Sequence, residues 1–561
     1  MSPIDWIVMC GFLGFVVIYG TWKTRKTSDI DSYIRAGRKT PWFTITLSIM
    51  ATQASAITFL STPGQAYVDG MRFVQFYLGL PIAMIILSIT AVPIYNKLNV
   101  YTAYEYLEKR FDLKNRMLGS ALFLSQRGLA AGFTIYAPSI ILSVILGWEI
   151  NTTIILIGTL VIIYTAVGGT EAVNKTHLLQ MVIITIGMFS AFAMIYILLP
   201  EKVSFIDAAY IAGKMGKLNA IDFNFDLDNR YTFWSGMIGG TFLMLSYFGT
   251  DQSQVQRYLA GSSVAQSRIA LLVNGLVKVP MQFIILFIGA MVFVFYQFVT
   301  PPLFFNPVQE DLVKNSVYSE QYSDLQNSYE KIQIEKRENI VSLLSSIDKN
   351  DKTSIDENKK QLAEKEKDAQ KTRTEAKELI KKANPDADTD DTNYIFISFI
   401  VNFLPIGLVG LVLAAILSAS MSSTSAELNA LASTTVIDFY KRLIKKEADD
   451  RHYVFISKIS TVLWGMYAIS FALLAQQLGS LVEAVNILGS LVYGTILGIF
   501  LTAFYLKRVG GTPTFIAALI AEIIVLYCYF FTSIPFLWFN MIGCLLVLGL
   551  GLVLNPVLKK S

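Results

Sequence analysis

The sequence predicts an all-α polytopic membrane protein, because both its composition and its hydropathy pattern differ from those of a soluble domain. Of the 561 residues, 53% are hydrophobic and 16% are charged, and the mean hydropathy is +0.50. Soluble proteins carry about 45–50% apolar and about 25% charged residues. Apolar runs of roughly 20 residues recur along the chain, and each is long enough to cross ~30 Å of hydrocarbon as a helix.

Run length and apolar content predict about thirteen spans. The first is expected to remain as a span, because no small-residue cleavage site follows it. The three cysteines and two histidines form no disulfide pattern and no zinc motif. The spans lie near 4–22, 41–66, 73–95, 117–146, 152–170, 177–199, 231–258, 269–299, 404–436, 453–476, 481–505, 512–532 and 534–556.

Lysine and arginine gather in alternate loops of this arrangement, at 23–39, 97–116 and 441–458, and again at 507–508 and 559–560. All of these loops fall on one side of the thirteen-span count. The positive-inside rule therefore predicts that they are cytoplasmic. We expect a multi-pass protein of the plasma (inner) membrane, with the N-terminus outside and the C-terminus in the cytoplasm.

Residues 306–392 do not read as membrane spans, because they are rich in Glu, Lys, Gln, Asp and Ser. Spaced apolar residues such as Leu325, Ile332 and Ile340 predict two charged helices that turn near Lys349–Thr353 and pair as a hairpin. The span count places this hairpin outside. A solvated insertion is the favoured interpretation, and a lid or a binding element for an extracytoplasmic protein partner is the alternative.

Two predicted spans are interrupted by polar residues, at Ser48–Gly64 and where the seventh span passes through Gly249 into Asp251. Paired interruptions at matching places indicate inverted repeats that hold substrate and ion at unwound backbone. A third segment, Ala414–Ser425, brings hydroxyl side chains that can replace the water around a small hard cation. Together they predict an ion-coupled transport site, although Gly and Pro can also simply kink packed helices.

Three motifs make the chain resemble the sodium/solute symporter family. They are Gly168-Gly169-Thr170-Glu171-Ala172-Val173, then Asp251-Gln252 followed by Gln256-Arg257-Tyr258-Leu259-Ala260, then Ala414-Ala415 with Met421-Ser422-Ser423 and Asn429. Tyr104–Arg110 with Phe111, and Tyr136-Ala137-Pro138, resemble the iodide, multivitamin and monocarboxylate branch. The sodium–galactose and sialic-acid symporters are further points of resemblance.

The resemblance implies a leucine-transporter-like core of two inverted five-helix repeats, with alternating access driven by sodium. On this chain, 1–40 would hold the first span and a cytoplasmic loop, and 41–200 the first repeat. The second repeat would occupy 201–505, interrupted by the 306–392 insertion, and 506–561 would hold the last two spans.

The family's central sodium site combines backbone carbonyls of the first core helix with oxygens of the eighth. The matching positions here are Ala51 and Ala54, then Ala419, Ser422 and Ser423. Small-residue helix packing is the alternative role of the serines. In the fifth core helix the family usually has an aspartate after a threonine, but here Thr176 is followed by His177. This difference puts a second sodium site in doubt.

Glu427 follows the serines closely, and we hypothesise that it faces His177 on the cytoplasmic ion path as a titratable pair. Two interfacial residues without such a role are the alternative.

Arg127 lies roughly 15 Å into the fourth span at 1.5 Å per residue, where a charge costs at least ~2.5–3.5 kcal/mol on insertion scales. A guanidinium suits a carboxylate, and the family's sialic-acid symporters place an arginine in this helix. A structural pair with Asp251 or Glu483, or snorkelling, is the alternative. Lys278 matches a sugar-contacting lysine of the galactose symporter. The other predicted residues of the substrate site are Gln53, Ser55, Thr58, Phe73, Gln75, Tyr77, Asp251 and Glu483.

The sequence thus predicts a sodium-coupled symporter that imports a small organic solute, with a carboxylate-bearing anion favoured over a sugar or polyol. A transporter-derived sensor is the alternative of another class, and no channel filter or enzyme motif is visible. The expected partners are the solute, sodium and the lipid bilayer. Neither a cofactor beyond the coupling ion nor nucleic acid is expected.

Overall fold

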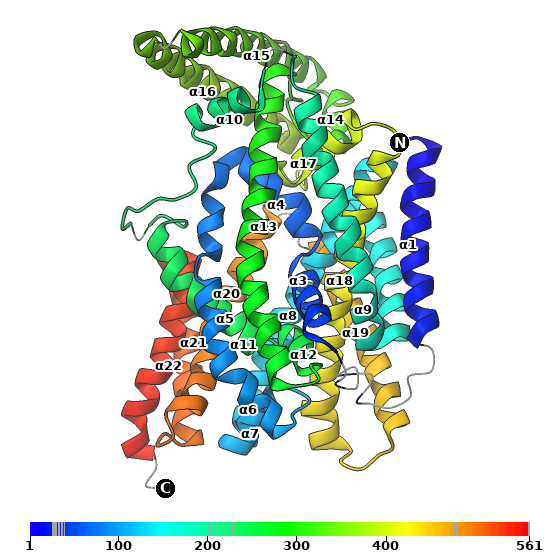
Figure 1. Cartoon of the computed structure of the whole chain (residues 1–561), viewed down its shortest axis with the longest axis vertical. Coiled ribbons are helices and arrows are strands. Elements are labelled where there is room, and N and C mark those ends of the chain that lie inside the picture. Colours follow the sequence, from blue (N-terminus) through cyan, green and yellow to red (C-terminus); the bar gives the residue numbers. More distant parts are fainter. Residues whose placement is uncertain are drawn as a thin grey trace.

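The computed structural model describes the chain except residues 25–30, 32–33, 35–37, 39, 202, 227, 350, 475–479 and 559–561, and the side chains of 20–24, 167–175 and 348. The described part is helical, and the helices run along one long axis (Figure 1). Each predicted span overlaps helix. Among the described residues, nine helical stretches are long and apolar enough to cross a membrane, and three shorter apolar helices accompany them.

The first half of the chain begins with α1 (Pro3–Thr24) and then breaks its second span into two helices. The order is α1, α3 (Trp42–Gln53), α4 (Ala56–Asp69), the 3₁₀ segment η2 (Gly70–Tyr77), α5 (Leu80–Ile89), α6 (Ala91–Leu98), α7 (Tyr104–Arg110), α8 (Leu113–Leu146), α9 (Ile150–Ile197) and α10 (Phe205–Lys214). Asp112 starts α8 by accepting a hydrogen bond from the Asn115 amide at 3.0 Å. Gly147 ends it in the left-handed conformation, φ +65°.

Two predicted spans fall within α9, and the chain bends sharply between them. The hydroxyls of Tyr164 and Thr176 lie 3.1 Å apart. A straight helix would separate residues twelve positions apart by about 18 Å. α9 is therefore bent between its two apolar stretches, in agreement with two separate spans.

The second half repeats the pattern, with a break between α11 (Gly240–Gly249) and α12 (Gln252–Leu259). The π-helical η3 (Ser235–Gly239) precedes α11. After α12 the chain continues through α13 (Val264–Phe298), α17 (Thr392–Phe403), α18 (Leu408–Thr434), the π-helical η4 (Thr435–Ile444), α19 (Asp450–Leu474), α20 (Leu481–Tyr505), α21 (Gly511–Phe531) and α22 (Phe536–Leu558). The short buried helix α17 was not expected, since its residues were divided between the insertion and the loop before the ninth span.

The charged insertion forms α14 (Pro307–Lys314), α15 (Ser319–Asp348) and α16 (Lys352–Ala383), with the predicted turn between the last two. The α15–α16 hairpin lies across the end of the helical body that also holds the N-terminus, opposite the C-terminus (Figure 1). Leu362, Ala369 and Ala376 of α16 are buried. The hairpin is therefore packed rather than freely solvated.

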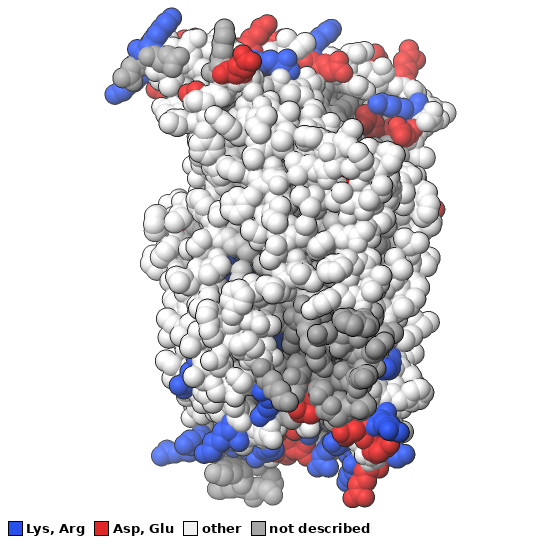
Figure 2. All heavy atoms as spheres, turned by 45° about the vertical axis from the view of Figure 1, so that its right-hand side comes forward, with Lys and Arg blue, Asp and Glu red and all other residues white. Residues whose placement is uncertain are grey.

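Charged side chains gather at the two ends of the molecule, with a broad and almost uncharged band between them (Figure 2). Large apolar side chains on the outer helices are exposed, such as Ile523 (66%), Phe530 (69%) and Val553 (69%). Exposed apolar surface of this extent requires an apolar solvent, and the band matches the hydrocarbon layer of a bilayer. The core lies inward, where α18 is buried from Val409 to Thr434 apart from isolated positions.

Candidate functional site

The break in the second span lies at Ala54 and Ser55, within the interruption that the sequence predicted at Ser48–Gly64. Ala54 has φ −86° and ψ 73°, and Ser55 has an extended backbone (φ −77°, ψ 175°), so the helix stops at Gln53 and restarts at Ala56. Helical hydrogen bonding is interrupted here, which frees backbone carbonyls inside the protein. The seventh span breaks likewise at Thr250 and Asp251.

The broken helix packs against α18, which carries the candidate sodium ligands. Ala51, Ala54, Ala419, Ser422 and Ser423 are all at most 2% exposed. The Ser423 hydroxyl donates to the Ala419 and Ser420 carbonyls, both at 3.1 Å. The Ser422 hydroxyl is buried without a hydrogen-bond partner among the described residues. A buried unpaired oxygen is costly, and a bound cation would satisfy it.

His177 lies beside these residues rather than opposite Glu427. Its Nδ1 is 3.0 Å from the Ser48 hydroxyl of α3, whereas Glu427 bonds to Arg127 and Thr134 of α8. The predicted His177–Glu427 pair is therefore wrong. The physical reason is helix geometry: Ser422 and Glu427 are five residues apart on α18, so their side chains point about 140° apart.

A cavity of about 90 Å³ lies beside the break. Of the predicted substrate residues, it is lined by Gln53, Ser55, Thr58, Tyr77 and Arg127, and Glu427 also reaches it. Further lining residues that the sequence did not reveal include Gln126, Thr134, Tyr247, Asn486 and Tyr493. Asn486 and Tyr493 could have been noticed as polar residues within the apolar α20.

Arg127 is buried in this wall and pairs with two carboxylates, those of Asp251 and Glu427. Its Nε donates to Asp251 Oδ2 at 3.0 Å and its Nη1 donates to Glu427 Oε1 at 3.0 Å. The Tyr493 hydroxyl donates to Asp251 Oδ2 at 2.8 Å, and the guanidinium lies 5.4 Å from the Tyr247 ring centroid. The sequence alternative of a pair with Asp251 is thus present, and Glu427 joins it.

The other predicted wall residues lie outside the cavity lining. Gln75 fastens a loop, since it donates to the Tyr231 carbonyl at 2.8 Å and accepts from the Asp222 amide at 2.9 Å. Phe73 stacks on Phe76 with centroids 5.3 Å apart. These positions turn away because η2 is a 3₁₀ helix, which places side chains differently from an α-helix.

Three further predicted residues do not line the cavity and contact other side chains instead. They are Glu483, Asp251 and Lys278. Glu483 accepts from Arg230 at 2.9 Å and from the Tyr231 hydroxyl at 2.8 Å. Asp251 sits behind Arg127 and caps α12. The Lys278 ammonium lies 5.8 Å from the Tyr77 ring centroid and has no hydrogen-bond partner within the described part of the chain.

Contacts between helices lie on both sides of the cavity. Toward the hairpin, the Ser480 hydroxyl donates to Gln65 Oε1 at 2.9 Å, and the Val482 amide donates to the Ser61 hydroxyl at 3.4 Å. On the opposite side, Arg116 pairs with Asp438 at 2.7 Å and with Glu108 at 2.8 Å. Hydrogen bonds and ion pairs thus join the helices toward both ends of the molecule.

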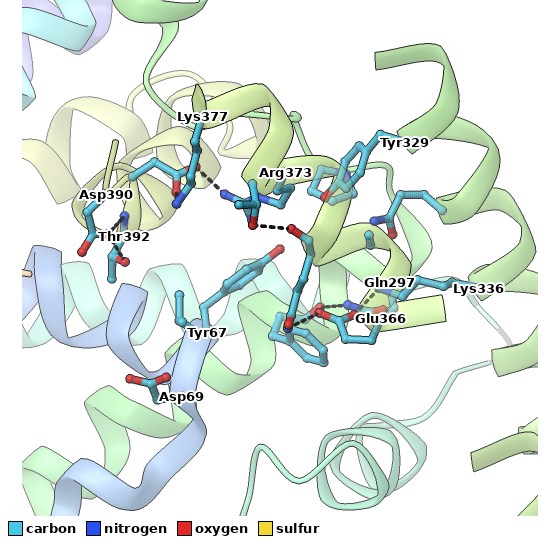
Figure 3. Close-up of a pocket in the computed structure, with 18 of the residues that line it drawn as sticks. Tyr67, Asp69, Gln297, Tyr329, Lys336, Glu366, Arg373, Lys377, Asp390 and Thr392 are labelled. Carbon is cyan, nitrogen blue, oxygen red and sulfur yellow. Dashed lines mark hydrogen bonds and ion pairs between the residues drawn. The ribbon is translucent and has the colours of Figure 1, made fainter. Parts of the chain in front are cut away.

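A second and larger space, about 650 Å³, lies between the hairpin and the end of α4, and we call it the hairpin pocket (Figure 3). Arg373 and Lys377 of α16 pair with Asp391, the residue that precedes α17, and Lys336 pairs with Glu366 at 2.6 Å. Tyr67 and Asp69 project from α4 into the same space. The hairpin is thus joined by ion pairs to the start of α17.

The comparisons with known proteins agree with this geometry. The family model described as "Sodium:solute symporter family" matches residues 33–320 and 380–521. The chain belongs to the sodium:solute symporter family. It is therefore a multi-pass membrane protein and a sodium-coupled symporter, and this family consists of transporters.

Three similar proteins illustrate the family. The sodium/sialic acid symporter NanT of Aliivibrio fischeri is 23% identical over 100% of this chain and 94% of its own length. The human sodium/iodide cotransporter is 33% identical over 44% of this chain and 38% of its own. Human sodium-coupled monocarboxylate transporter 1 is 31% identical over 48% of this chain and 44% of its own.

Among solved structures, a substrate-bound, outward-open Na⁺-coupled sialic acid symporter matches with a TM-score of 0.75. The match covers 99% of this chain and 98% of that chain at 22% identity, and it shows a shared fold. The predicted leucine-transporter-like, all-α fold is confirmed. The Gly168–Val173 motif lies among residues whose side chains fall outside the described part.

Proposed function

We propose that this protein imports a small organic anion that carries a carboxylate, by alternating access and together with sodium. The observation that carries the proposal is Arg127, a buried guanidinium on the wall of the cavity beside the helix break. A guanidinium binds a carboxylate through two parallel hydrogen bonds. The named substrates of NanT and of the monocarboxylate transporter carry carboxylates as well.

The proposed sodium site takes carbonyl oxygens from Ala51, Ala54 and Ala419 and hydroxyl oxygens from Ser422 and Ser423. The unpartnered Ser422 hydroxyl supports it. Neutral oxygens suit a monovalent cation, and an ion between α3–α4 and α18 would tie the two proposed repeats, 41–200 and 201–505, together. Because a ligand shifts an equilibrium only through its differential affinity, sodium would favour the form in which these helices approach.

A polyhydroxylated solute is the second candidate, and the cavity amides favour it. Gln53, Gln126 and Asn486 line the space beside the rings of Tyr77 and Tyr247. Amides and aromatic rings suit hydroxyl-bearing carbon rings. A sugar acid would combine both chemistries.

We further propose that the N-terminus and the hairpin are outside and that the C-terminus is cytoplasmic.

Uptake into proteoliposomes tests the proposal. Sialic acid, short monocarboxylates, vitamins, inositols and hexoses are supplied with and without a sodium gradient. We expect sodium-dependent uptake of a carboxylate, and we expect Arg127→Lys to weaken it because one point donor replaces a fork. Arg230→Gln, at the exposed Glu483 pair, is the matched control. Uptake of hexoses alone, or unchanged anion uptake in Arg127→Lys, would refute the assignment.

A further inference from the structure

The charges around Arg127 do not balance. One guanidinium faces two carboxylates, Asp251 and Glu427, whose side chains are 0% and 6% exposed. The groups that face Glu427 are Arg127 and Thr134 from α8, Asp251 from the α11–α12 break and Tyr247 from α11, with Tyr493 of α20 beyond Arg127. With both carboxylates ionised, this cluster carries one net negative charge inside the membrane.

The two carboxylates are held very differently. Asp251 Oδ1 accepts from the Ser253 amide at 2.8 Å and from the Ser253 hydroxyl at 2.6 Å, and its Oδ2 accepts from Tyr493 and Arg127. Glu427 has one bond per oxygen, from Arg127 at 3.0 Å and from the Thr134 hydroxyl at 2.9 Å. Asp251 is therefore fixed as the cap of α12, whereas Glu427 can leave Arg127 by a side-chain rotation.

Glu427 is also the carboxylate that faces the cavity, and it lies on the helix of the sodium ligands. It lines the cavity, whereas Asp251 is not among the residues of that wall. It follows Ser423 by four residues on α18, so the two side chains lie one above the other on the same face. Glu427 therefore lies one helical turn from a proposed sodium ligand.

A solute carboxylate that binds Arg127 has to replace Glu427. If Glu427 stayed ionised, the cluster would then hold three carboxylates and one guanidinium, with a second net negative charge in a low-dielectric site. A proton on Glu427 removes this second charge. The solute-bound cluster then carries the same single negative charge as the empty one.

We propose that Glu427 is a proton-binding site and that a proton is a second coupling ion. Glu427 takes one proton from the outer medium as it gives up Arg127, and its carboxyl then donates to a neighbouring oxygen. On solute release inside, the proton leaves to the cytoplasm and the carboxylate returns to Arg127. Each cycle thus moves one proton with the anion and sodium. This inference rests on the proposed function, because it requires a carboxylate at Arg127.

Charge measurement in proteoliposomes tests it, with sialic acid or lactate, whichever is taken up. Transported charge per solute is compared between the wild type and Glu427→Gln, whose amide resembles the protonated carboxyl. We expect one charge fewer per solute in Glu427→Gln, no solute-driven proton influx, and retained sodium dependence. In the wild type, the apparent affinity for the solute should fall about tenfold per pH unit above the pKa that Glu427 has in the solute-free protein, because solute binding is linked to the uptake of one proton.

Glu335→Gln is the matched control, because it removes the same carboxylate charge at an exposed pair with Lys365 on the hairpin, and neither residue lines the cavity. It should retain proton influx. Sodium-dependent anion uptake with equal charge per solute in the wild type and Glu427→Gln would overturn the inference. If Glu427→Gln does not fold, proton uptake on solute binding is read from a pH dye with the wild type in weak buffer, and no uptake between pH 6 and pH 8 overturns it. Absence of sodium-dependent anion uptake in the wild type refutes the proposed function instead.

Discussion

Gly64 offers a direct test of how the outer side of the protein closes. An added Cβ at this position of α4 would lie 2.0 Å from the Thr392 carbonyl oxygen of α17. On its other side α4 is supported by α13, since a Cβ on Gly289 would lie 2.1 Å from the Pro63 carbonyl. With neighbours on both sides, Gly64→Ala has to push α4 and α17 apart.

The displacement and its energetic cost follow from the contacts. Ordinary van der Waals contact begins at 3.4 Å, so α4 and α17 must separate by at least 1.4 Å, the difference from 2.0 Å. We expect such a shift of α4 to break its bonds to the start of α20, those of Gln65 with Ser480 and of Ser61 with Val482. Two hydrogen bonds contribute about 1–3 kcal/mol to the closed form. Their loss should therefore raise the ratio of molecules that are open on the hairpin side to molecules that are closed there roughly 5- to 150-fold.

Labelling of a cavity cysteine measures this ratio. Asn486→Cys is introduced into a background in which Cys10, Cys528 and Cys544 are replaced by alanine, and a membrane-impermeant maleimide is added from the hairpin side. Labelling should accelerate by the same factor in Gly64→Ala. Gly549→Ala is the control, because nothing lies within 4 Å of a Cβ there. Equal labelling rates in the two variants would show that the α4–α17 contact does not close the outer side.

Three further predictions concern the ion site, the hairpin and pH. Ser422→Ala should raise the sodium concentration for half-maximal uptake roughly 10- to 150-fold, the effect of about 1.5–3 kcal/mol from one bond to a charged group, whereas Ser470→Ala on α19 should not. Arg373→Gln leaves the buried Asp391 partly unpaired, at a cost of about 3–5 kcal/mol, and should speed hydrogen exchange in α16, unlike Lys365→Gln at an exposed pair. Burial raises the pKa of Asp388, in the loop before α17, to about 7. Its folded-state pKa lies above the usual value, so its contribution to stability is complete below pH ~4 and is lost as the pH rises through about 7. The wild-type unfolding temperature should therefore fall between pH 5 and pH 8, less so in Asp388→Asn; an equal fall in both would contradict this.

The sequence predicted the features that depend on local residue pattern. The break at Ala54–Ser55 was visible because polar residues and glycine interrupt an apolar run, and the hairpin turn was visible because charged residues surround regularly spaced apolar ones. The sodium-site positions on α18 came from the family resemblance at Ser422 and Ser423, because the hydroxyls of Ser418, Ser420, Thr424 and Ser425 lie in the same segment and residue pattern alone does not separate them.

The contacts of the charged residues could not be predicted in the same way. Whether Glu427 meets His177 or Arg127 depends on how α18 is rotated against α8 and α9, and residue spacing in one chain carries no information about that rotation. Phe73 and Gln75 were misplaced because the pattern does not distinguish a 3₁₀ segment from an α-helix. Lys278 was placed by resemblance, but its ammonium lies 5.8 Å from the ring of the cavity residue Tyr77 and does not itself line the cavity.

The ion-paired α15–α16 hairpin gives this transporter a solvent-accessible element that is connected to the broken helix through α17. The family model skips residues 321–379, which make up nearly all of α15 and α16, yet these helices are anchored at the start of a helix that packs against the broken span. A soluble molecule that binds the hairpin, an antibody fragment for example, could alter how readily the protein opens on the hairpin side. Its binding site would share no residue with the solute path, so competition with the solute would be absent while the turnover rate changed.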